Sequence, residues 1–252
     1  MSLLANLTSD ESIEESGDSV GGGNYGPLES GIYACNIKLA YLSESTGGAA
    51  CLNLHLETDA GLEVRQAIYL SSGRKKGQKN TYETKDGKRK YLPGYELGMH
   101  LGLLTCGLEP SDWDVEEKVV SLWNSEAKKE VPTAVDVVMS LTGQAIKAGL
   151  LKVIEDKNVQ DESGNYVPSG ETREINDVDK FFRASDNMTV TEIKAEELTE
   201  GAFLPVWEEK WAGKTRDKST KDAKGPNGNV TSGAFGKAAA SAPQPKQSLF
   251  TK

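Results

Sequence analysis

Residues 31–70 read GIYACNIKLAYLSESTGGAACLNLHLETDAGLEVRQAIYL, and this stretch decides the fold. Apolar and polar residues alternate over residues 32–42, again over 52–57, and again over 62–70. A period of two residues is typical of a β-strand with one buried face. Polar turns at 43–48 and 59–61 separate the three runs. The sequence therefore predicts three consecutive strands.

If the registers of these strands match, one outward face carries a mixed set of polar, basic and aromatic side chains. Its members are Lys38, Asn53, His55, Arg65 and Tyr69. This face is the first candidate surface for a ligand.

Further elements follow along the chain. Pro93 precedes a short helical pattern over 94–104, which ends before Gly107. The apolar run 134–141 predicts a buried strand, 145–154 another strand, and 171–182 a returning strand. Three strands, a helix and further strands follow the order of an oligonucleotide-binding (OB) barrel. We therefore expect a mainly β fold, with an OB-fold-like five-stranded barrel, a protruding basic β-hairpin, short helices and disordered termini.

The last part of this domain has two helical signals. Thr189 and Glu192 have the spacing of a capping box, which predicts a short helix after them. Trp207 and Trp211 are four residues apart, and we expect them to cover the barrel rather than to bind a ligand.

Composition divides the chain into three parts. Residues 1–30 contain six acids and no Lys or Arg, and they include too few large apolar residues to offset the entropy of ordering. Residues 212–252 are rich in Gly, Pro, Ala and Lys, which is typical of a flexible tail. We therefore expect a flexible acidic segment at 1–30, one domain at 31–211 and a flexible basic tail at 212–252.

The segment 74–95 concentrates positive charge in a chain whose formal net charge is −9. It holds eight cations and two acids, a local charge of +6, with tyrosines interleaved. Cations follow phosphates and aromatic rings stack on unpaired bases, so this combination indicates single-stranded nucleic-acid binding. Asp86-Gly87 predicts a two-residue hairpin turn in the middle of the segment. The alternative interpretation is a solvated basic loop.

Catalytic and metal signals are weak. The Gly-x-Ser-x-Gly pattern at 17–21 lies in the acidic segment without the strand-to-helix turn that the motif needs. The two histidines have no ligand-spaced partners, and Cys35, Cys51 and Cys106 lack a Cys-x-x-Cys spacing. We therefore expect reduced cysteines, no cofactor, no metal and no enzymatic activity.

Location is predicted from two further features. No apolar run approaches the ~18 residues of a transmembrane helix. Acids stand where a signal peptide would carry cations. These features predict a cytoplasmic protein.

Several stretches resemble single-stranded DNA-binding proteins of tailed bacteriophages. They are the opening strand at 31–33, the segment 145–154, the stretch 173–182 and the Gly/Lys/Ala-rich end. The resemblance covers residues 32–211. It implies an OB-type domain, non-catalytic binding of unwound DNA, roles in phage DNA replication and recombination, and a place in the host cytoplasm.

The resulting hypothesis is a protein that coats and protects single-stranded DNA. The residues expected to contact it are Lys38, Arg65, Tyr69, Arg74, Lys75, Lys76, Lys79, Tyr82, Lys85, Lys88, Arg89, Lys90 and Tyr91. Two other interpretations remain open. The acidic bulk of the chain could imitate DNA and occupy a DNA-binding partner, or paired carboxylates could hold Mg²⁺ in a nuclease, although no spacing singles out a pair.

The C-terminal end adds a second candidate site. From Lys210 onward, nine cations oppose two acids, a net charge of +7, whereas many proteins of this function end in an acidic tail. The basic tail ends in Leu249, Phe250 and Lys252, which we expect to contact a replication, recombination or transcription protein.

Overall fold

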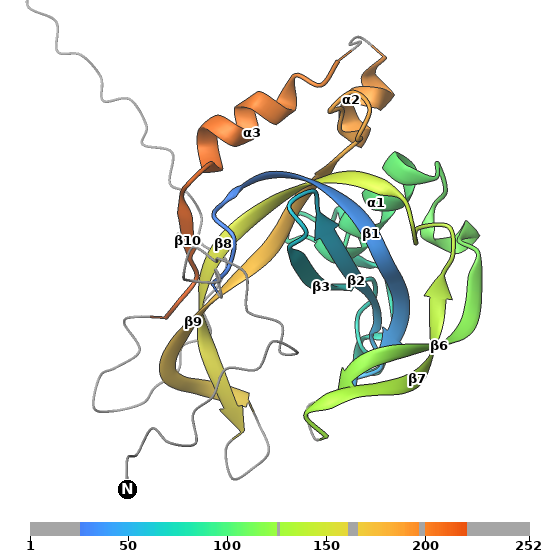
Figure 1. Ribbon diagram of the computed structural model, residues 1–252, viewed down its shortest axis with the longest axis vertical. Coiled ribbons are helices and arrows are strands. Elements are labelled where there is room, and N and C mark those ends of the chain that lie inside the picture. Colours follow the sequence, from blue (N-terminus) through green and yellow to red (C-terminus); the bar gives the residue numbers. More distant parts are fainter. Residues whose placement is uncertain (1–25, 125–126, 161–165, 197–199, 221–252) are drawn as a thin grey trace, which may run out of the picture.

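A computed structural model describes residues 26–124, 127–160, 166–196 and 200–220 of this chain. The fold is mainly β, with a large, mostly antiparallel sheet, a separate two-stranded ribbon and few helices (Figure 1). The strands are β1 (Gly31–Glu44), β2 (Ala50–Thr58), β3 (Glu63–Tyr69), β4 (Thr81–Glu83), β5 (Arg89–Tyr91), β6 (Val115–Asn124), β7 (Lys129–Val138), β8 (Ala145–Gln160), β9 (Tyr166–Phe182) and β10 (Thr215–Asp217). The helices are α1 (Pro93–Thr105), α2 (Val190–Ala195) and α3 (Phe203–Trp211), with single 3₁₀ turns η1 (Arg74–Lys76) and η2 (Pro110–Asp112).

The three strands predicted first are confirmed as an antiparallel meander, β1–β2–β3. On β2, Leu52, Leu54 and Leu56 are fully buried, as their alternation predicts. On β1 the alternation does not persist, because a bulge between Ile37 and Leu39 shifts the register. Burial consequently moves from Ile37 to Ala40, and the expected apolar face at odd positions changes sides.

β1 is the central strand of the main sheet. It pairs with β2 along most of its length, with β8 at its start and with β7 at Tyr41 and Leu42. β8 pairs in turn with β9 on an antiparallel ladder and with β10 on a parallel one. The strands that follow one another along this path are therefore β9, β8, β1, β2 and β3.

The structure differs from the expected five-stranded barrel in two respects. The main sheet has eight strands, because the β6–β7 hairpin and β10 add to the five, and it is not a closed barrel. Within the described residues no backbone ladder joins β3 to β9. Instead the side chain of Gln66 reaches across, and its Oε1 accepts a hydrogen bond of 3.1 Å from the backbone N–H of Val178.

The helix predicted at 94–104 is confirmed as α1. Its glycines, which weaken an isolated helix, allow close packing here. A Cβ at Gly98 would lie 2.7 Å from Leu70 Cδ2, and one at Gly102 would lie 2.4 Å from the carbonyl oxygen of Leu108. Leu101 and Leu104 are buried against the sheet, so α1 fastens the end of β3 to the core.

Gly94 makes the tightest of these contacts, which leads to a stability prediction. A Cβ at Gly94 would lie 2.2 Å from the carbonyl oxygen of Tyr69, an atom that cannot move without displacing β3. We expect Gly94→Ala to reduce the free energy of unfolding by about 1–3 kcal/mol. Urea unfolding of this variant and of Gly26→Ala, whose added Cβ meets nothing within 4 Å, measures the effect. Equal midpoints for the two variants would contradict the prediction.

The β6–β7 hairpin differs from expectation. The run 134–141 was expected to form a buried strand, but in β7 only Val137 and Val138 are buried. The remaining residues pair with β6 in a hairpin that extends along the margin of the molecule (Figure 1). The apolar run is exposed because this hairpin is a two-stranded extension of the sheet, which the core covers only at its base.

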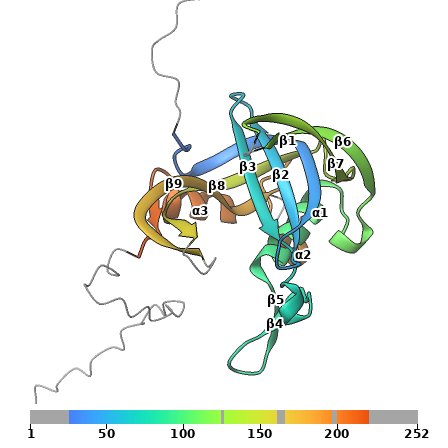
Figure 2. The same ribbon diagram turned by 90° about the horizontal axis from the view of Figure 1, so that it is seen from below.

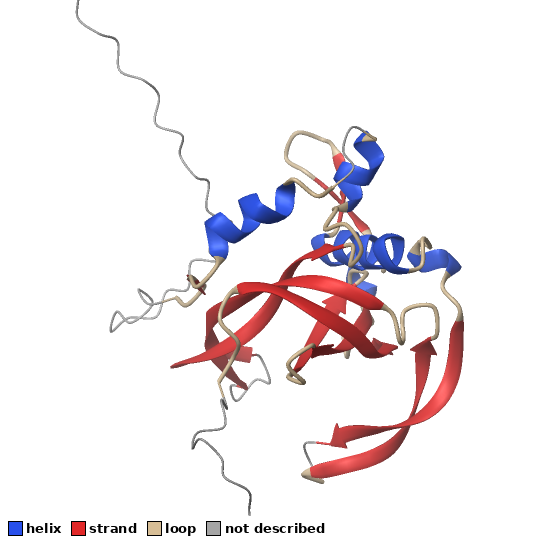
Figure 3. Ribbon diagram, turned by 45° about the horizontal axis from the view of Figure 1, so that its top comes forward, coloured by secondary structure: helices blue, strands red, loops and turns tan. Residues whose placement is uncertain are grey.

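The C-terminal elements lie over the sheet, and Figure 3 shows the helices gathered on one side of it. The capping box at Thr189 and Glu192 is confirmed at the start of α2. Trp207 of α3 is buried in a small cluster with Leu151 and Phe182, so its predicted structural role is confirmed. β10 joins the sheet at residues 215–217, and the folded part therefore extends into the range 212–252 that was expected to be a tail. No helix among the described residues is long and apolar enough to cross a membrane.

Candidate nucleic-acid interface

The basic segment leaves the end of β3 and forms η1 and the β4–β5 ribbon, which projects from the body of the molecule (Figure 2). Backbone bonds close its base. The N–H of Ser72 donates to the carbonyl of Lys79 at 2.8 Å, and the N–H of Leu92 donates to the carbonyl of Asn80 at 2.8 Å. The segment predicted to protrude does so from a fixed base.

The first basic turn, η1, is held on the loop between β1 and β2. The N–H of Arg74 donates to the carbonyl of Gly47, and the side-chain amide of Gln78 donates to the carbonyl of Gly48, both at 2.8 Å. Arg74 also forms an ion pair with Glu44. These contacts fix the backbone that carries Lys75 and Lys76 relative to the sheet.

The turn of the ribbon corrects the sequence-based expectation. Asp86-Gly87 was expected to form a two-residue turn with positive φ at both positions. The N–H of Gly87 instead donates to the carbonyl of Thr84, and the Thr84 N–H donates to the carbonyl of Lys88. Only Gly87 has a positive φ, 72°. The loop thus has three residues, a type I turn followed by a left-handed glycine, and Asp86 needs no unusual conformation.

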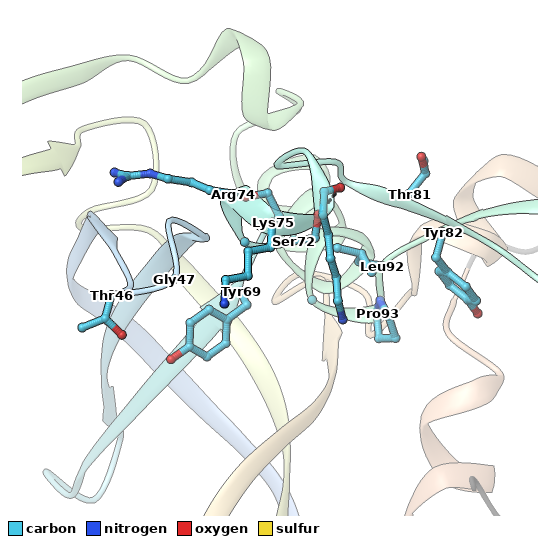
Figure 4. A pocket seen from close by; sticks show the side chains of 14 residues that line it. Thr46, Gly47, Tyr69, Ser72, Arg74, Lys75, Thr81, Tyr82, Leu92 and Pro93 are labelled. Carbon is cyan, nitrogen blue, oxygen red and sulfur yellow. Dashed lines mark hydrogen bonds between the residues drawn. The ribbon is translucent and has the colours of Figure 1, made fainter. Parts of the chain in front are cut away.

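A pocket of about 940 Å³ lies where β3, η1, β4 and the start of α1 meet. Tyr69 and Tyr82 belong to its wall and are 54% and 43% exposed. Figure 4 shows the rings of Tyr69 and Tyr82 on opposite sides of the pocket, while the side chain of Arg74 extends away from both. Leu92 and Pro93 add apolar surface. The volume lies within the ~300–1,000 Å³ range of ligand pockets, and the lining suits a flat, partly apolar ligand.

The cations of the basic segment lack acidic partners. Among the described residues, the only ion pair made by its eight cations is that of Arg74 with Glu44. The other seven are exposed and form no ion pair with any acid that the structure describes, namely Lys75, Lys76, Lys79, Lys85, Lys88, Arg89 and Lys90. In a chain with 38 acids and 29 Lys and Arg residues, unpaired cations gathered in one segment form a surface that attracts an anion from outside.

Lys38 and Arg65, the two cations expected to contact DNA from the sheet, do have acidic partners. Lys38 Nζ lies 3.1 Å from Glu57 and 3.3 Å from Glu63, and the hydrogen bond to Glu57 raises the pKa of Lys38. Arg65 lies 3.6 Å from Glu63. Neighbouring carboxylates therefore already neutralise both side chains, which the structure places apart from the pocket of Tyr69 and Tyr82.

Tyr82 and Tyr91 do not share a face of the ribbon. Tyr82 stands opposite Lys90 and Tyr91 stands opposite Thr81 in the ladder. Because directly opposed residues share a face and successive residues alternate, the two tyrosines project to opposite sides. Tyr91 instead packs beside Tyr95, with ring centroids 5.1 Å apart. Tyr69 and Tyr82 are thus the pair that the structure brings to one pocket.

A second hollow, of about 280 Å³, lies between the sheet and β6. Tyr41, His55 and Arg65 line it on the sheet side, and Leu122 and Trp123 line it on the β6 side. Burial, followed by the nearby Arg65, lowers the pKa of His55, so this side chain is neutral at neutral pH. The β6 residues of this hollow were not among the predicted site residues, and the adjacent Leu and Trp in the stretch 115–124 are the sequence signal that could have indicated them.

The remaining candidate residues are possible metal ligands, the cysteines and the C-terminal partner-binding residues. Residues 26–124, 127–160, 166–196 and 200–220 contain no group of three His, Cys, Asp or Glu side chains placed to hold a metal ion. Burial raises the pKa of the Cys35 thiol to about 11, and Cys51 is also buried, so these two thiols are poor nucleophiles. The expected partner-binding residues Leu249, Phe250 and Lys252 lie outside the described residues.

Comparison with known proteins gives no independent assignment. No protein-family model matches the chain, and a search of curated proteins finds no match.

Proposed function

We propose that this protein is a non-catalytic single-stranded DNA-binding protein whose contact surface is the basic segment and the pocket of Tyr69 and Tyr82. The observation that carries the proposal is the coincidence of unpaired cations with two half-exposed tyrosines on one pocket. Cations held by their own acids, such as Lys38, would have to break an ion pair to reach a phosphate. Within the described residues, the cations of the basic segment, Arg74 excepted, have no such pair to break.

The strand order offers further support. The path β9–β8–β1–β2–β3, with a helix between β3 and β8, corresponds to the strand order of an OB fold. OB folds are partly open barrels that bind oligonucleotides over strands two and three and the loop between strands one and two. The basic turn η1 rests on that loop, and Tyr69 ends the third strand. The resemblance of the sequence to phage single-stranded DNA-binding proteins implies the role that we propose here, the coating of unwound DNA in phage replication and recombination.

A titration tests the proposal. Fluorescence anisotropy of labelled oligo-dT, oligo-U and a duplex of equal length would be measured against the full-length protein. We expect oligo-dT to bind more tightly than the duplex, since stacking needs unpaired bases, and binding to weaken as salt is added. Equal affinity for oligo-dT and duplex, or an affinity that salt does not change, would overturn it. An absence of DNA binding would favour the DNA-mimic alternative.

The two faces of the ribbon give a prediction about individual tyrosines. Tyr69→Ala and Tyr82→Ala should each weaken oligo-dT binding by about 1–3 kcal/mol and leave the salt dependence unchanged, because a stacked ring but no charge is lost. Tyr91→Ala should bind close to wild type, since this ring packs on Tyr95 at the opposite face. A larger loss for Tyr91→Ala than for Tyr82→Ala would show that the DNA follows the other side of the ribbon.

A further inference from the structure

The β6 strand is a free edge of the main sheet in the part of the chain that the structure describes. Within the described residues it pairs with β7 only, over ten consecutive positions without a register shift. Proteins usually protect an exposed edge by a short strand, a proline, a bulge or several charges. β6 has no proline or bulge, and its charged residues, Glu116, Glu117 and Lys118, all lie in its first half, where Glu116 pairs with Lys118 at 3.1 Å.

Three of the exposed side chains of β6 are large and apolar. Val119 and Trp123 are 70% and 57% exposed, and Val115 is also exposed. The three residues are four apart, so they share one face of the strand. A polar edge strand would leave its backbone groups to water, whereas this one adds a row of apolar side chains beside them.

We propose that β6 pairs antiparallel with β6 of a second copy of this chain, in a two-fold register centred on Val119. This register places Val119 opposite Val119 of the partner subunit and Val115 opposite Trp123 of the partner subunit. A two-fold interface uses the same surface on both subunits, and the spacing of the apolar row is symmetric about Val119.

Neighbouring registers are less favourable on charge. A two-fold centre on Glu117 or on Lys118 would set that residue against its own copy, and like charges directly opposite destabilise a sheet. A centre on Val120 would set Glu117 against Trp123 of the partner subunit. The register centred on Val119 opposes no like charges, and it pairs all three exposed apolar residues with one another.

The position of β6 leaves the proposed DNA surface free. Figure 2 shows the β6–β7 hairpin and the β4–β5 ribbon in different parts of the molecule. Pairing through β6 would therefore extend the sheet from one subunit to the next without covering the basic segment. Self-association through β6 does not depend on the proposed function.

Sedimentation equilibrium of the full-length protein without DNA tests the pairing. We expect wild type to pass from its monomer mass of 27.1 kDa to twice that mass between micromolar and sub-millimolar concentrations. Val119→Lys and Val119→Glu should each weaken the dimer about tenfold or more, because each sets like charges opposite one another. An equimolar mixture of the two variants should regain the dimer, since the opposed charges then attract.

The matched control is Ala134→Lys, which adds the same charge beside Val119 on β7, one strand away from the edge. It should dimerise as wild type does. Wild type that stays monomeric, a dimer that survives Val119→Lys, a mixture that stays monomeric, or equal loss in Ala134→Lys would each overturn the proposal. Amide exchange on wild type requires no variant, and protection of residues 115–123 that does not rise with concentration would overturn it too.

Discussion

Replacing Lys75, Lys76 and Lys79 together by Ala should weaken oligo-dT binding strongly and reduce its dependence on salt. The three side chains are exposed, form no ion pair within the described residues and lie on or beside the pocket of Tyr69 and Tyr82. Each phosphate contact on a single strand contributes about −0.7 to the slope of log affinity against log salt, so three contacts contribute about −2. At about 0.15 M salt this loss corresponds to roughly 50-fold weaker binding.

A charge-matched control separates local contact from overall charge. Lys157, Arg173 and Lys218 are ion-paired with Glu171, Glu155 and Asp177 on the β8–β9 arm. Replacing these three by Ala changes the net charge of the chain by the same amount. We expect this variant to keep the wild-type slope and an affinity within a few-fold of wild type. Equal losses in the two triple variants would mean that general electrostatic attraction, not phosphate contact at the pocket, accounts for binding.

Much of the sheet could be predicted because its signals are local. The alternation in residues 50–58 needs only one covered face, and the fully buried Leu52, Leu54 and Leu56 confirm it. The bulge on β1 could not be predicted, because the alternation of apolar residues continues through it. It arises where β1 changes neighbours, from β8 before residue 37 to β7 after residue 40.

The pairing of β6 with β7 could not be predicted, for a different physical reason. Val119 and Trp123 are exposed, whereas Val120 and Leu122 are half-buried on the other face. When apolar residues lie on both faces of a strand, apolar and polar residues do not alternate along the sequence. An edge hairpin that is half in water can form without this alternation.

The residue types of the candidate site were predicted from the sequence, but their arrangement in space was not. The clustering of cations and tyrosines is readable in the sequence, but the pairing of Lys38 with Glu57 and Glu63 depends on residues 19 and 25 positions away. The separation of Tyr82 from Tyr91 depends on one residue of loop length in the ribbon. The register of the strands decides which residues of a basic segment can act together, and this register cannot be read from the composition.

Replacing Trp207 by Ala should cost more stability than any other substitution proposed for this chain, about 3–5 kcal/mol of the free energy of unfolding. The side chain is 2% exposed and lies with Leu151 and Phe182 in a cluster apart from the main core. A Cβ at Gly149 would lie 3.0 Å from the indole, so β8 and the ring are in direct contact. The indole Nε1 also donates to Asp179 Oδ2 at 2.8 Å, and the truncation removes this bond as well.

Trp211, one helical turn later, is the matched comparison. It is only partly buried, and its ring meets Lys210 at 5.0 Å and Arg216 at 6.0 Å. Contacts of this kind at an exposed site contribute about 0.5–1 kcal/mol, so Trp211→Ala should change urea unfolding far less than Trp207→Ala does. Trp207→Phe should recover most of the loss, because a ring still fills the cluster while the hydrogen bond to Asp179 is absent. Oligo-dT affinity, measured where each variant is folded, should equal wild type in all three. A different outcome would contradict the prediction, namely a Trp207→Ala protein with wild-type stability and weaker oligo-dT binding. The side chain of Trp207 would then belong to the DNA-binding surface and would not pack against β8.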